Sequence, residues 1–352
     1  MIDPADLEHC KASIRTGSYS FHAASRLLPG RVRDPALALY AFCRLTDDAV
    51  DLTHEKTEAV LMLGERLDAI YRGQPRNTPT DRAFAAVVED FEMPRTLPEA
   101  LLEGMAWDAM EKRYHTLSDV YAYSARVAAA VGVMMTVLMR VRCPHALARA
   151  CDLGVAMQLT NIARDVGEDA RARRIYLPLD WLAQAGIDIE AFFDNPRPTR
   201  EIRKLTRRLI ADANRLYFRS EPGVAALPFA CRPGIFAARN IYGGIGREVA
   251  RRHYDSINTR AYTTKGQKIG WLIQSTLETL VVSVMPRSAV LYGKPLPECA
   301  YLVEAAAERL PSDNPWGEGR AGELIAVLAQ LEAKRRQAQP VAALVEERKR
   351  AI

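Results

Sequence analysis

The spacing of apolar residues along the chain predicts helices through most of its length. Asp34 and Pro35 precede an apolar-periodic run over residues 36–50, which predicts a helix with an aspartate N-cap and a proline in its first turn. A second helix is predicted from Leu97 through Trp107. No alternation of strand and helix patterns indicates a parallel sheet, so the sequence predicts an all-α protein.

Two long segments rich in Ala, Leu and Met also predict helices, and they cover residues 120–139 and 146–168. Prolines then mark a loop-rich connection between residues 178 and 198. Further helices are predicted at residues 199–217, 234–254 and 268–285. The glycine-rich run at 243–246 lies inside a helical pattern without a preceding strand, which argues against a dinucleotide-binding loop.

The C-terminal part of the chain has a different composition. Pro, Ser, Asp, Asn and Gly cluster between residues 311 and 322, and apolar residues then recur at helical spacing beside Lys334-Arg335-Arg336. We therefore expect one domain over residues 5–305 and a tail over residues 306–352 that carries an amphipathic helix. That helix would either dock on the body or be held loosely, or it would be a basic amphipathic contact with a membrane or a partner.

Composition and charge narrow the class of protein. Of the 352 residues, 49% are hydrophobic and 26% are charged, which is typical of a globular protein and excludes a disordered chain. The 48 Lys and Arg exceed the 43 Asp and Glu by five, an excess too small and too scattered for a dedicated nucleic-acid binder. We therefore expect no nucleic-acid partner. The length allows either two domains or one large helical domain.

Cysteine spacing and apolar runs bear on the compartment. The six cysteines show no C-x-x-C pair, so we expect reduced thiols rather than disulfides or a zinc site. Residues 1–6 lack the basic and apolar run of a signal peptide. The most apolar stretch, Val127–Met139, is shorter than the roughly 18–20 residues that span a bilayer. The expected location is the cytoplasm, either free or in peripheral contact with the inner membrane.

The first acidic motif lies in the predicted helix over residues 36–50 and just beyond it. Asp47 and Asp51 are one helical turn apart on one face, and Arg44 lies one turn earlier. The surrounding sequence is apolar, where an unpaired carboxylate is costly. A single D-x-x-x-D pattern is common at solvated helix ends, so this motif alone does not identify a site.

A second motif makes a solvated helix end harder to accept. Asn161, Asp165 and Asp169 follow one another at intervals of four and line one helix ridge, which Gln158 extends. The other faces of that helix are apolar. Oxygen ligands in this number suit Mg²⁺ or Mn²⁺, and a diphosphate held between two acidic helices would supply the remaining oxygens and the balancing charge.

Basic and hydroxyl side chains are expected to converge on that diphosphate. The candidates are Arg44, Arg164, Arg171, Arg174, Arg260, Tyr40, Tyr176, Tyr242, Ser18 and Ser20. The basic run over residues 200–208 is interpreted instead as a solvated helix face.

Longer motifs around these residues carry a family resemblance. From about residue 13 to residue 302 the chain resembles the bacterial phytoene synthases of the squalene/phytoene synthase family. The N-terminal match comprises Ser-Tyr-Ser-Phe at 18–21, Ser-Arg-Leu-Leu-Pro at 25–29 and Ala-Leu-Tyr-Ala-Phe-Cys-Arg at 38–44. Gln-Leu-Thr-Asn-Ile at 158–162 through Arg-Ile-Tyr-Leu-Pro at 174–178 carries the second signature.

The resemblance implies a fold and a set of site residues. The fold would be a single isoprenoid-synthase-type helical bundle with a central apolar cavity, lined in part by Phe21 and residues 127–139, although the latter could simply pack the core. Two or three Mg²⁺ or Mn²⁺ ions would be held by Asp47, Asp51, Asn161, Asp165 and Asp169. Asp47, Asp51, Asp165, Asp169 and Arg44 would be catalytic. Substrate would contact Ser18, Ser20, Phe21, Tyr40, Gln158, Arg164, Arg174, Tyr176, Tyr242 and Arg260.

The implied activity is the head-to-head condensation of two geranylgeranyl diphosphates to phytoene through prephytoene diphosphate, the first committed step of carotenoid synthesis, without NADPH. Downstream carotenoid enzymes and a membrane surface would be its partners. One alternative is a squalene-branch enzyme that uses farnesyl diphosphate and makes presqualene diphosphate. Another is a non-catalytic assembly factor of the same family, although such proteins have degraded acidic motifs.

One departure from the family pattern concerns the middle helix. Family members carry Tyr-x-Tyr-x-Val-Ala-Gly there, and the second tyrosine is thought to assist the chemistry. In this chain Tyr123 keeps the first position and Ala125 occupies the second. Because Tyr123 is offset by half a turn, we expect it to point elsewhere, which leaves open whether both half-reactions occur.

Overall fold

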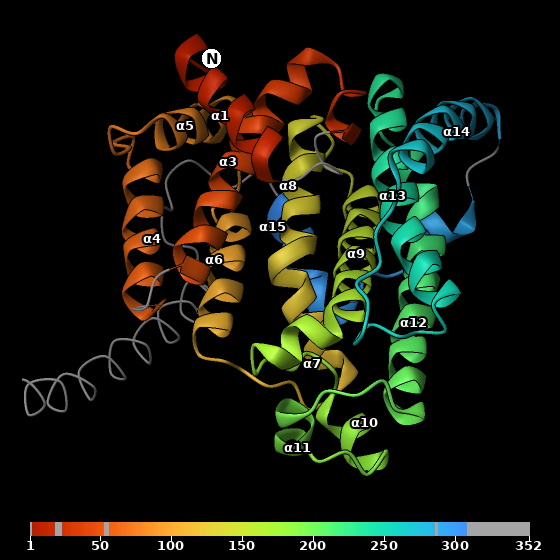
Figure 1. Ribbon diagram of the computed structural model, residues 1–352. Helices are drawn as coiled ribbons and strands as arrows, with labels where there is room; N and C mark the ends of the chain where they lie inside the picture. The colour runs from red at the N-terminus through yellow and green to blue at the C-terminus, as the bar shows by residue number, and fades with distance from the viewer. Residues whose placement is uncertain (1, 18–22, 53–55, 286–287, 308–352) are drawn as a thin grey trace, which may run out of the picture.

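The fold is helical throughout the part of the chain that can be described. The computed structural model describes residues 2–17, 23–52, 56–285 and 288–307, except the side chains of residues 15–17, 47–52, 56–57 and 265. Over these residues it contains helices and turns and no strand, which confirms the all-α prediction (Figure 1).

The helices differ widely in length. The long ones are α1 (Pro4–Gly17), α3 (Gly30–Leu52), α4 (Lys56–Tyr71), α5 (Pro79–Phe91), α6 (Thr96–Ala109), α9 (Pro144–Arg171), α12 (Arg200–Val224), α13 (Arg232–Arg251) and α14 (Lys265–Val284). Shorter ones are α7 (Leu117–Ser124), α8 (Ala130–Leu138), α10 (Leu179–Gln184), α11 (Ile189–Asp194) and α15 (Ala300–Ala307). A π-helical segment, η1 (Ala125–Ala129), joins α7 to α8, and three 3₁₀ turns are η2 (Phe229–Cys231), η3 (Ala289–Tyr292) and η4 (Pro297–Cys299).

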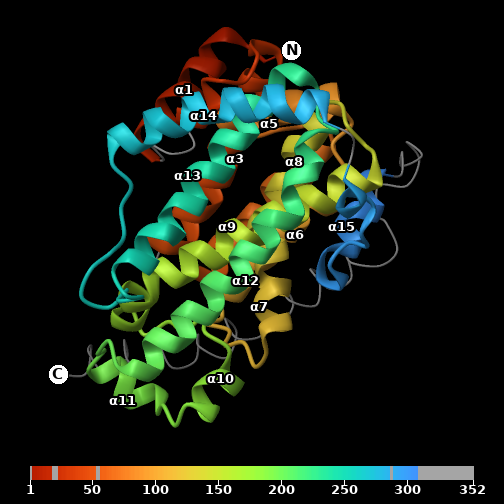
Figure 2. The ribbon, with the colours of Figure 1, turned by 90° about the vertical axis from the view of Figure 1, so that its right-hand side faces the viewer.

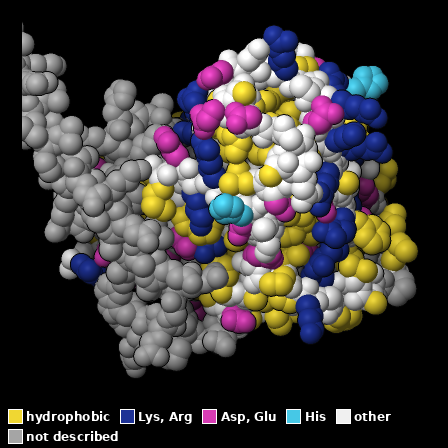
Figure 3. Space-filling view, turned by 90° about the horizontal axis from the view of Figure 1, so that it is seen from below, with side chains coloured by type: hydrophobic (Ala, Val, Ile, Leu, Met, Phe, Trp, Pro, Cys, Tyr) yellow, Lys and Arg dark blue, Asp and Glu magenta, His cyan; other side chains and the backbone are white. Residues whose placement is uncertain are grey.

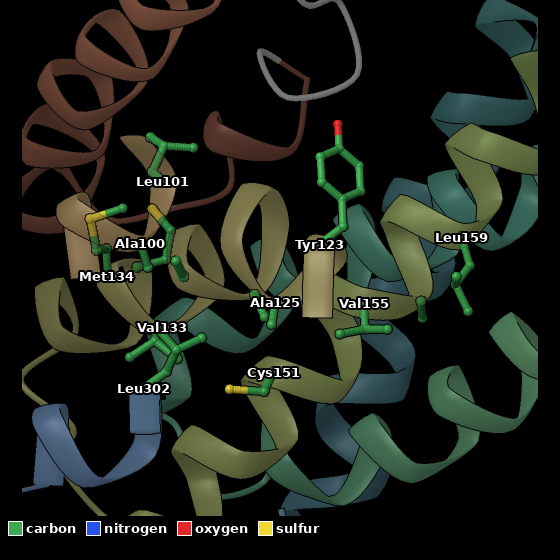
Figure 4. Close-up of a cluster of buried hydrophobic side chains, with 14 of the residues drawn as sticks. Ala100, Leu101, Tyr123, Ala125, Val133, Met134, Cys151, Val155, Leu159 and Leu302 are labelled. Carbon is green, nitrogen blue, oxygen red and sulfur yellow. The ribbon is translucent and has the colours of Figure 1, made fainter. Parts of the chain in front are cut away.

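Helix α9 forms the centre of the bundle and packs against α12, α13, α8 and η1 (Figures 1 and 2). Val155 and Leu159 of α9 are fully buried in the core cluster drawn in Figure 4. A Cβ added at Gly154 would lie 2.6 Å from the Cα of Ala129, so only glycine allows α9 to approach η1 this closely. The central helix is thereby held against the wall that α8 and η1 provide.

The segment α7–η1–α8 forms one continuous helix and confirms the prediction over residues 120–139. Thr116 caps it through a capping box with Asp119. The helix Leu117–Leu138 is long and apolar enough to cross a membrane, which the 127–139 run by itself did not indicate, but 72% of its most apolar window is buried inside the protein. Its apolar surface therefore packs in the core and around a cavity.

The predicted start of one helix was wrong. Helix α3 begins at Gly30 rather than at Asp34, because the Pro29 carbonyl accepts hydrogen bonds from the N–H groups of Val32 and Arg33 and starts a turn upstream. The fixed φ of Pro35 is compatible with a helix, so the chain continues through it. The region 178–198 is the loop-rich connection that was predicted, and it also carries the short helices α10 and α11, the second of which is capped by the Asp188 side chain.

The other predictions differ in outcome. Helices α6, α9, α12, α13 and α14 lie where helices were predicted, within three residues at their starts. The Thr199 side chain caps α12, and this helix continues to Val224, beyond its predicted end at residue 217. All six cysteines are free thiols. Helix α15 packs on α9, so the helical body extends to residue 307. The composition change at 311–322 and the amphipathic helix beyond it lie outside the described residues.

Candidate active site

An apolar cavity lies between α8, α9, α12 and α13 and encloses about 1190 Å³ of empty space, counting the part open to solvent. Val127, Val131, Met135 and Met139 line it at intervals of four residues, which is one face of the α7–η1–α8 helix. The opposite face packs in the core. The stretch 127–139 therefore lines a cavity with one face and packs the core with the other, the two alternatives expected for it. Further lining residues include Leu153, Gly154, Met157, Val224, Leu227, Ile235 and Ala238.

Polar side chains interrupt the largely apolar wall of this cavity at several points, including Ser25, Thr136, Arg149 and Ser220. Gln158, Asn161 and Tyr242 line the cavity, and burial raises the pKa of Tyr242, so its hydroxyl is neutral. The Oδ1 atom of Asn161 is buried and has no hydrogen-bond partner. A buried carbonyl oxygen without a donor is costly, and it fits a ligand or cation that would occupy this end of the cavity.

Asp165 is held by two arginines. Arg164 donates from Nε to Asp165 Oδ1 at 2.8 Å, and Arg260 donates from Nε to the same oxygen at 2.8 Å and from Nη2 to Oδ2 at 3.2 Å. Burial acts to raise the pKa of this carboxyl, but the hydrogen bonds and charges of the two arginines outweigh it and hold the pKa below its usual value. Asp165 is therefore ionised at neutral pH.

Asp169, one turn further along α9, has the opposite protonation preference. Burial, together with the negative charge of Asp165, raises the pKa of Asp169 to about 8, and the charge of Arg174 opposes that shift only in part. Two carboxylates on one ridge thus differ in charge at neutral pH. A cation bound between them would favour the ionised form of both.

Asp108 of α6 also belongs to this cluster, and sequence reasoning missed it. Its Oδ1 accepts a hydrogen bond from the hydroxyl of Tyr176, and its Oδ2 accepts one from Tyr123, both at 2.8 Å. Its negative charge also contributes to the raised pKa of Asp169. The only sequence signal was an aspartate at the end of an apolar helix, next to Trp107.

The departure from the family pattern has a structural counterpart. Ala125 is fully buried at the start of η1, while Tyr123 points away from the core cluster around Ala125 and Val155 (Figure 4). The ring of Tyr123 stacks on that of Tyr176 with centroids 5.2 Å apart. We expected Tyr123 to point elsewhere, but its hydroxyl donates to Asp108, the same residue that accepts from Tyr176.

The other predicted residues lie at different distances from this cluster. Tyr40 and Arg44 are half-buried on α3. Arg174 follows α9, and its N–H donates to the Asp169 carbonyl at 2.8 Å. Arg171 lies in a separate hollow with Arg164 and Arg260, where its Nη2 donates to the Ile257 carbonyl at 2.6 Å, so it holds a loop rather than facing the cavity.

Part of the predicted site lies outside the described residues. Helix α3 carries positions 47 and 51 one turn apart, but the side chains of Asp47 and Asp51 are not described. Ser18, Ser20 and Phe21 are likewise outside. The convergence of the two acidic motifs stays a prediction.

The donors that can be described suit a hard cation but do not form a complete site. Asn161, Asp165 and Asp169 offer only oxygen, and the Asn161 oxygen lacks a partner. Within the described part of the chain, no group of three or more His, Cys, Asp or Glu could hold a metal ion by itself. This fits magnesium, which binds through a few protein oxygens and completes its shell with water and substrate phosphates.

Comparison with known proteins places the chain in a family. The sequence model of the squalene/phytoene synthase family matches residues 14–267. The chain is 61% identical over 339 residues to a phytoene synthase of Rhodobacter capsulatus, covering 96% of this chain and 98% of the relative. It is 59% identical to a phytoene synthase of Cereibacter sphaeroides, covering 96% of each chain.

Solved structures agree with that match. A dehydrosqualene synthase structure superposes with a TM-score of 0.71 at 29% identity, covering 79% of this chain and 97% of the other. A squalene synthase from Alicyclobacillus acidocaldarius shares the fold with a TM-score of 0.66 at 23% identity, covering 71% of this chain and 95% of the other. The chain belongs to the squalene/phytoene synthase family, and its fold is the isoprenoid-synthase-type helical bundle.

Proposed function

We propose that this chain condenses two molecules of geranylgeranyl diphosphate head to head to phytoene, through prephytoene diphosphate, and so starts carotenoid synthesis. The observation that carries the proposal is the apolar cavity whose polar wall is the ridge of Gln158 and Asn161, with Asp165 and Asp169 following on the same helix. A polyprenyl tail requires the apolar cavity, and a diphosphate requires the polar and acidic ridge. The high identity to phytoene synthases favours this substrate over the shorter farnesyl diphosphate.

The diphosphate groups would be bound by arginines around the acidic ridge. Arg164 and Arg260 both lie on Asp165, and the Arg260 side chain is 38% exposed, so it can turn toward an arriving anion. Arg174 lies close enough to Asp169 for its charge to offset part of the rise in the pKa of that carboxyl. Guanidinium groups bind phosphate oxygens in a bidentate way, which suits them to hold a departing diphosphate.

Mg²⁺ or Mn²⁺ ions, held by Asp47, Asp51, Asn161, Asp165 and Asp169, would neutralise negative charge on the leaving diphosphate. In the metal-free protein Asp169 holds a proton at neutral pH, because its pKa is raised to about 8. The arginines supply the fixed positive charge on the ridge. No NADPH is expected.

The walls of the cavity would protect the allylic and cyclopropylcarbinyl cations that this reaction passes through. Val131, Met135, Leu153 and Met157 present only hydrocarbon and thioether groups to the bound chains. Water has no strong hydrogen-bonding partner on these four side chains, so it is disfavoured beside the reacting carbons. Tyr176, oriented by Asp108, would position its hydroxyl at the polar end.

The proposal is tested by incubating purified protein with Mg²⁺, without NADPH, and with either geranylgeranyl or farnesyl diphosphate, and by identifying the products by mass. We expect phytoene from the C20 substrate. Accumulation of a cyclopropyl diphosphate would mean that the second half-reaction is absent. Products from the C15 substrate alone would assign the chain to the squalene branch, and no turnover by folded protein would overturn the proposal in favour of a non-catalytic role.

A further inference from the structure

Helix α14 presents an uncharged apolar face to the outside of the molecule. It runs along α13 at the periphery of the bundle (Figures 1 and 2). Ile269, Ile273, Leu277 and Val284 are between 59% and 85% exposed and recur at helical spacing, so they form one stripe. Leu280, Val281 and Met285 extend it, and we call these seven residues the α14 stripe.

Between residues 266 and 284, where the side chains of this helix are described, no charged side chain occupies an exposed position. Between residues 266 and 285 the only ionisable side chains are Lys268 and Glu278, and both are partly buried. Glu278 is turned inward, where it accepts hydrogen bonds at 2.7 Å from the Nδ2 of Asn240 and the Nε2 of Gln274. The opposite end of the molecule, seen in Figure 3, shows basic and acidic side chains interspersed among apolar ones, as is usual for a solvated surface.

We propose that the α14 stripe docks on the surface of a lipid bilayer, with the helix lying in the plane of the membrane. This inference rests on the proposed function, because both the prenyl substrate and the hydrocarbon product partition into lipid. A helix with one strongly apolar face binds at the boundary between headgroups and acyl chains, where that face is buried. Because α14 packs lengthwise on α13, it lies on the membrane rather than crossing it.

An exposed arginine borders the stripe and suits anionic headgroups. Arg247 is exposed, and its guanidinium lies over the ring of Trp271, 5.3 Å from the centroid. Arg232, near the other end of α14, is held within the protein, because its Nε, Nη1 and Nη2 donate to the Leu227 carbonyl, the Ser283 Oγ and the Ala225 carbonyl. An arginine at the edge of an apolar face can reach a lipid phosphate while its stem stays on apolar surface.

The shape of the stripe suits a flat, extended surface. A helix of 20 residues is about 30 Å long and, with its side chains, about 10 Å wide, so the stripe is long and narrow. Binding to a bilayer grows with each apolar side chain that inserts, so one exposed helix face can supply it.

The position of the stripe relative to the cavity agrees with a route for hydrocarbon. Ile235, Ala238 and Tyr242 of α13 line the cavity, and Asn240 of the same helix reaches Ser275 of α14 with a 3.1 Å hydrogen bond. Only one helix therefore separates the cavity from the stripe. A membrane at this face would lie close to the end product of the reaction.

The test is cosedimentation of the full chain with vesicles of phosphatidylcholine alone and of phosphatidylcholine mixed with phosphatidylglycerol. We expect binding to the mixed vesicles and a loss of at least about tenfold in partitioning for the double variant Leu277→Asp/Val284→Asp. The matched control is Met62→Asp, because Met62 is 45% exposed on α4, on the other side of the molecule from α14. It should bind as the unchanged chain does.

Two results would overturn the proposal: unchanged binding by the double variant, or no binding of the unchanged chain to either vesicle. If the unchanged chain binds no vesicle but forms a dimer that dissociates in the double variant, as measured by sedimentation velocity, the stripe is an interface between copies of the chain. Circular dichroism and turnover in detergent micelles check that the double variant folds. An unchanged chain that binds vesicles but lacks turnover would refute the proposed function and leave the docking surface intact.

Discussion

Arg260 and Asp165 are 95 positions apart in the chain, and their side chains form a two-point ion pair in which both carboxylate oxygens accept from one guanidinium. Arg164 adds a second guanidinium to the same carboxylate. The central acid of the α9 motif is thus neutralised by arginines in the metal-free protein. We predict that the same arginines receive the diphosphate.

Asp165→Asn should abolish turnover while the protein remains folded. The amide keeps the shape of the side chain but removes the negative charge, so we expect phytoene formation to fall by at least about 100-fold. The measurement is product formed from geranylgeranyl diphosphate, with circular dichroism to confirm folding. Asp180→Asn, an exposed aspartate on α10, is the matched control and should retain activity. Normal turnover by Asp165→Asn would contradict the role given to this carboxylate.

Arg260→Ala should lower activity with little effect on stability. The side chain is 38% exposed, so the ion pair contributes little to folding, whereas a diphosphate would lose a bidentate partner. We expect kcat/KM to fall by about tenfold or more, and Arg260→Lys to recover only part of it. A thermal unfolding curve that shifts as strongly as the activity would indicate a structural role instead.

Tyr123→Phe should destabilise the protein by about 1 kcal/mol, because it leaves one oxygen of the half-buried Asp108 carboxylate without its phenolic donor. Tyr176→Phe should have a similar cost through the other oxygen. Urea unfolding measures both. Tyr292→Phe serves as the control because Tyr292 is 54% exposed, and a loss for it as large as for Tyr123 would rule out the shared carboxylate as the cause.

The metal-free protein should lose stability as the pH rises from about 4 to about 8. Folded Asp169 keeps its proton up to a pKa of about 8, whereas the unfolded chain releases it near pH 4, so in this window the folded state binds more protons. The free energy of unfolding therefore falls with pH, by on the order of a few kcal/mol. Asp169→Asn should make that slope smaller in urea unfolding, although Glu99, Asp152 and Asp212, whose pKa values are also raised, keep part of it. A variant with the same slope as the unchanged protein would contradict the assignment.

Ala150→Phe should shift substrate preference toward the shorter chain. Ala150 lines the cavity eleven positions before Asn161 on α9, which is about 16 Å along the helix from the polar end. A larger side chain there shortens the space for a prenyl tail, so the ratio of farnesyl to geranylgeranyl turnover should rise about tenfold. Ala183→Phe, on the exposed side of α10, should leave the ratio unchanged.

Local sequence patterns predicted the helices well where a long apolar period continued without interruption. The 3.6-residue period placed α9 and the α7–η1–α8 helix correctly and put Asn161, Asp165 and Asp169 on one ridge. It did not predict the π-helical segment at 125–129, because one widened turn leaves no mark on apolar spacing. It also missed the start of α3, because Pro35 was interpreted as the beginning of the helix and in fact lies inside it.

The sequence by itself determined the all-α class, the acidic ridge of α9 and the apolar face that lines the cavity, because each depends on residues a few positions apart on one helix. Only the tertiary structure decided that Asp108 joins Tyr123 to Tyr176, that Arg260 reaches Asp165, and that the apolar side chains of the α14 stripe lie exposed. These contacts join helices far apart in the chain, and their partners are chosen by how the helices pack. Periodicity carries no information about that choice.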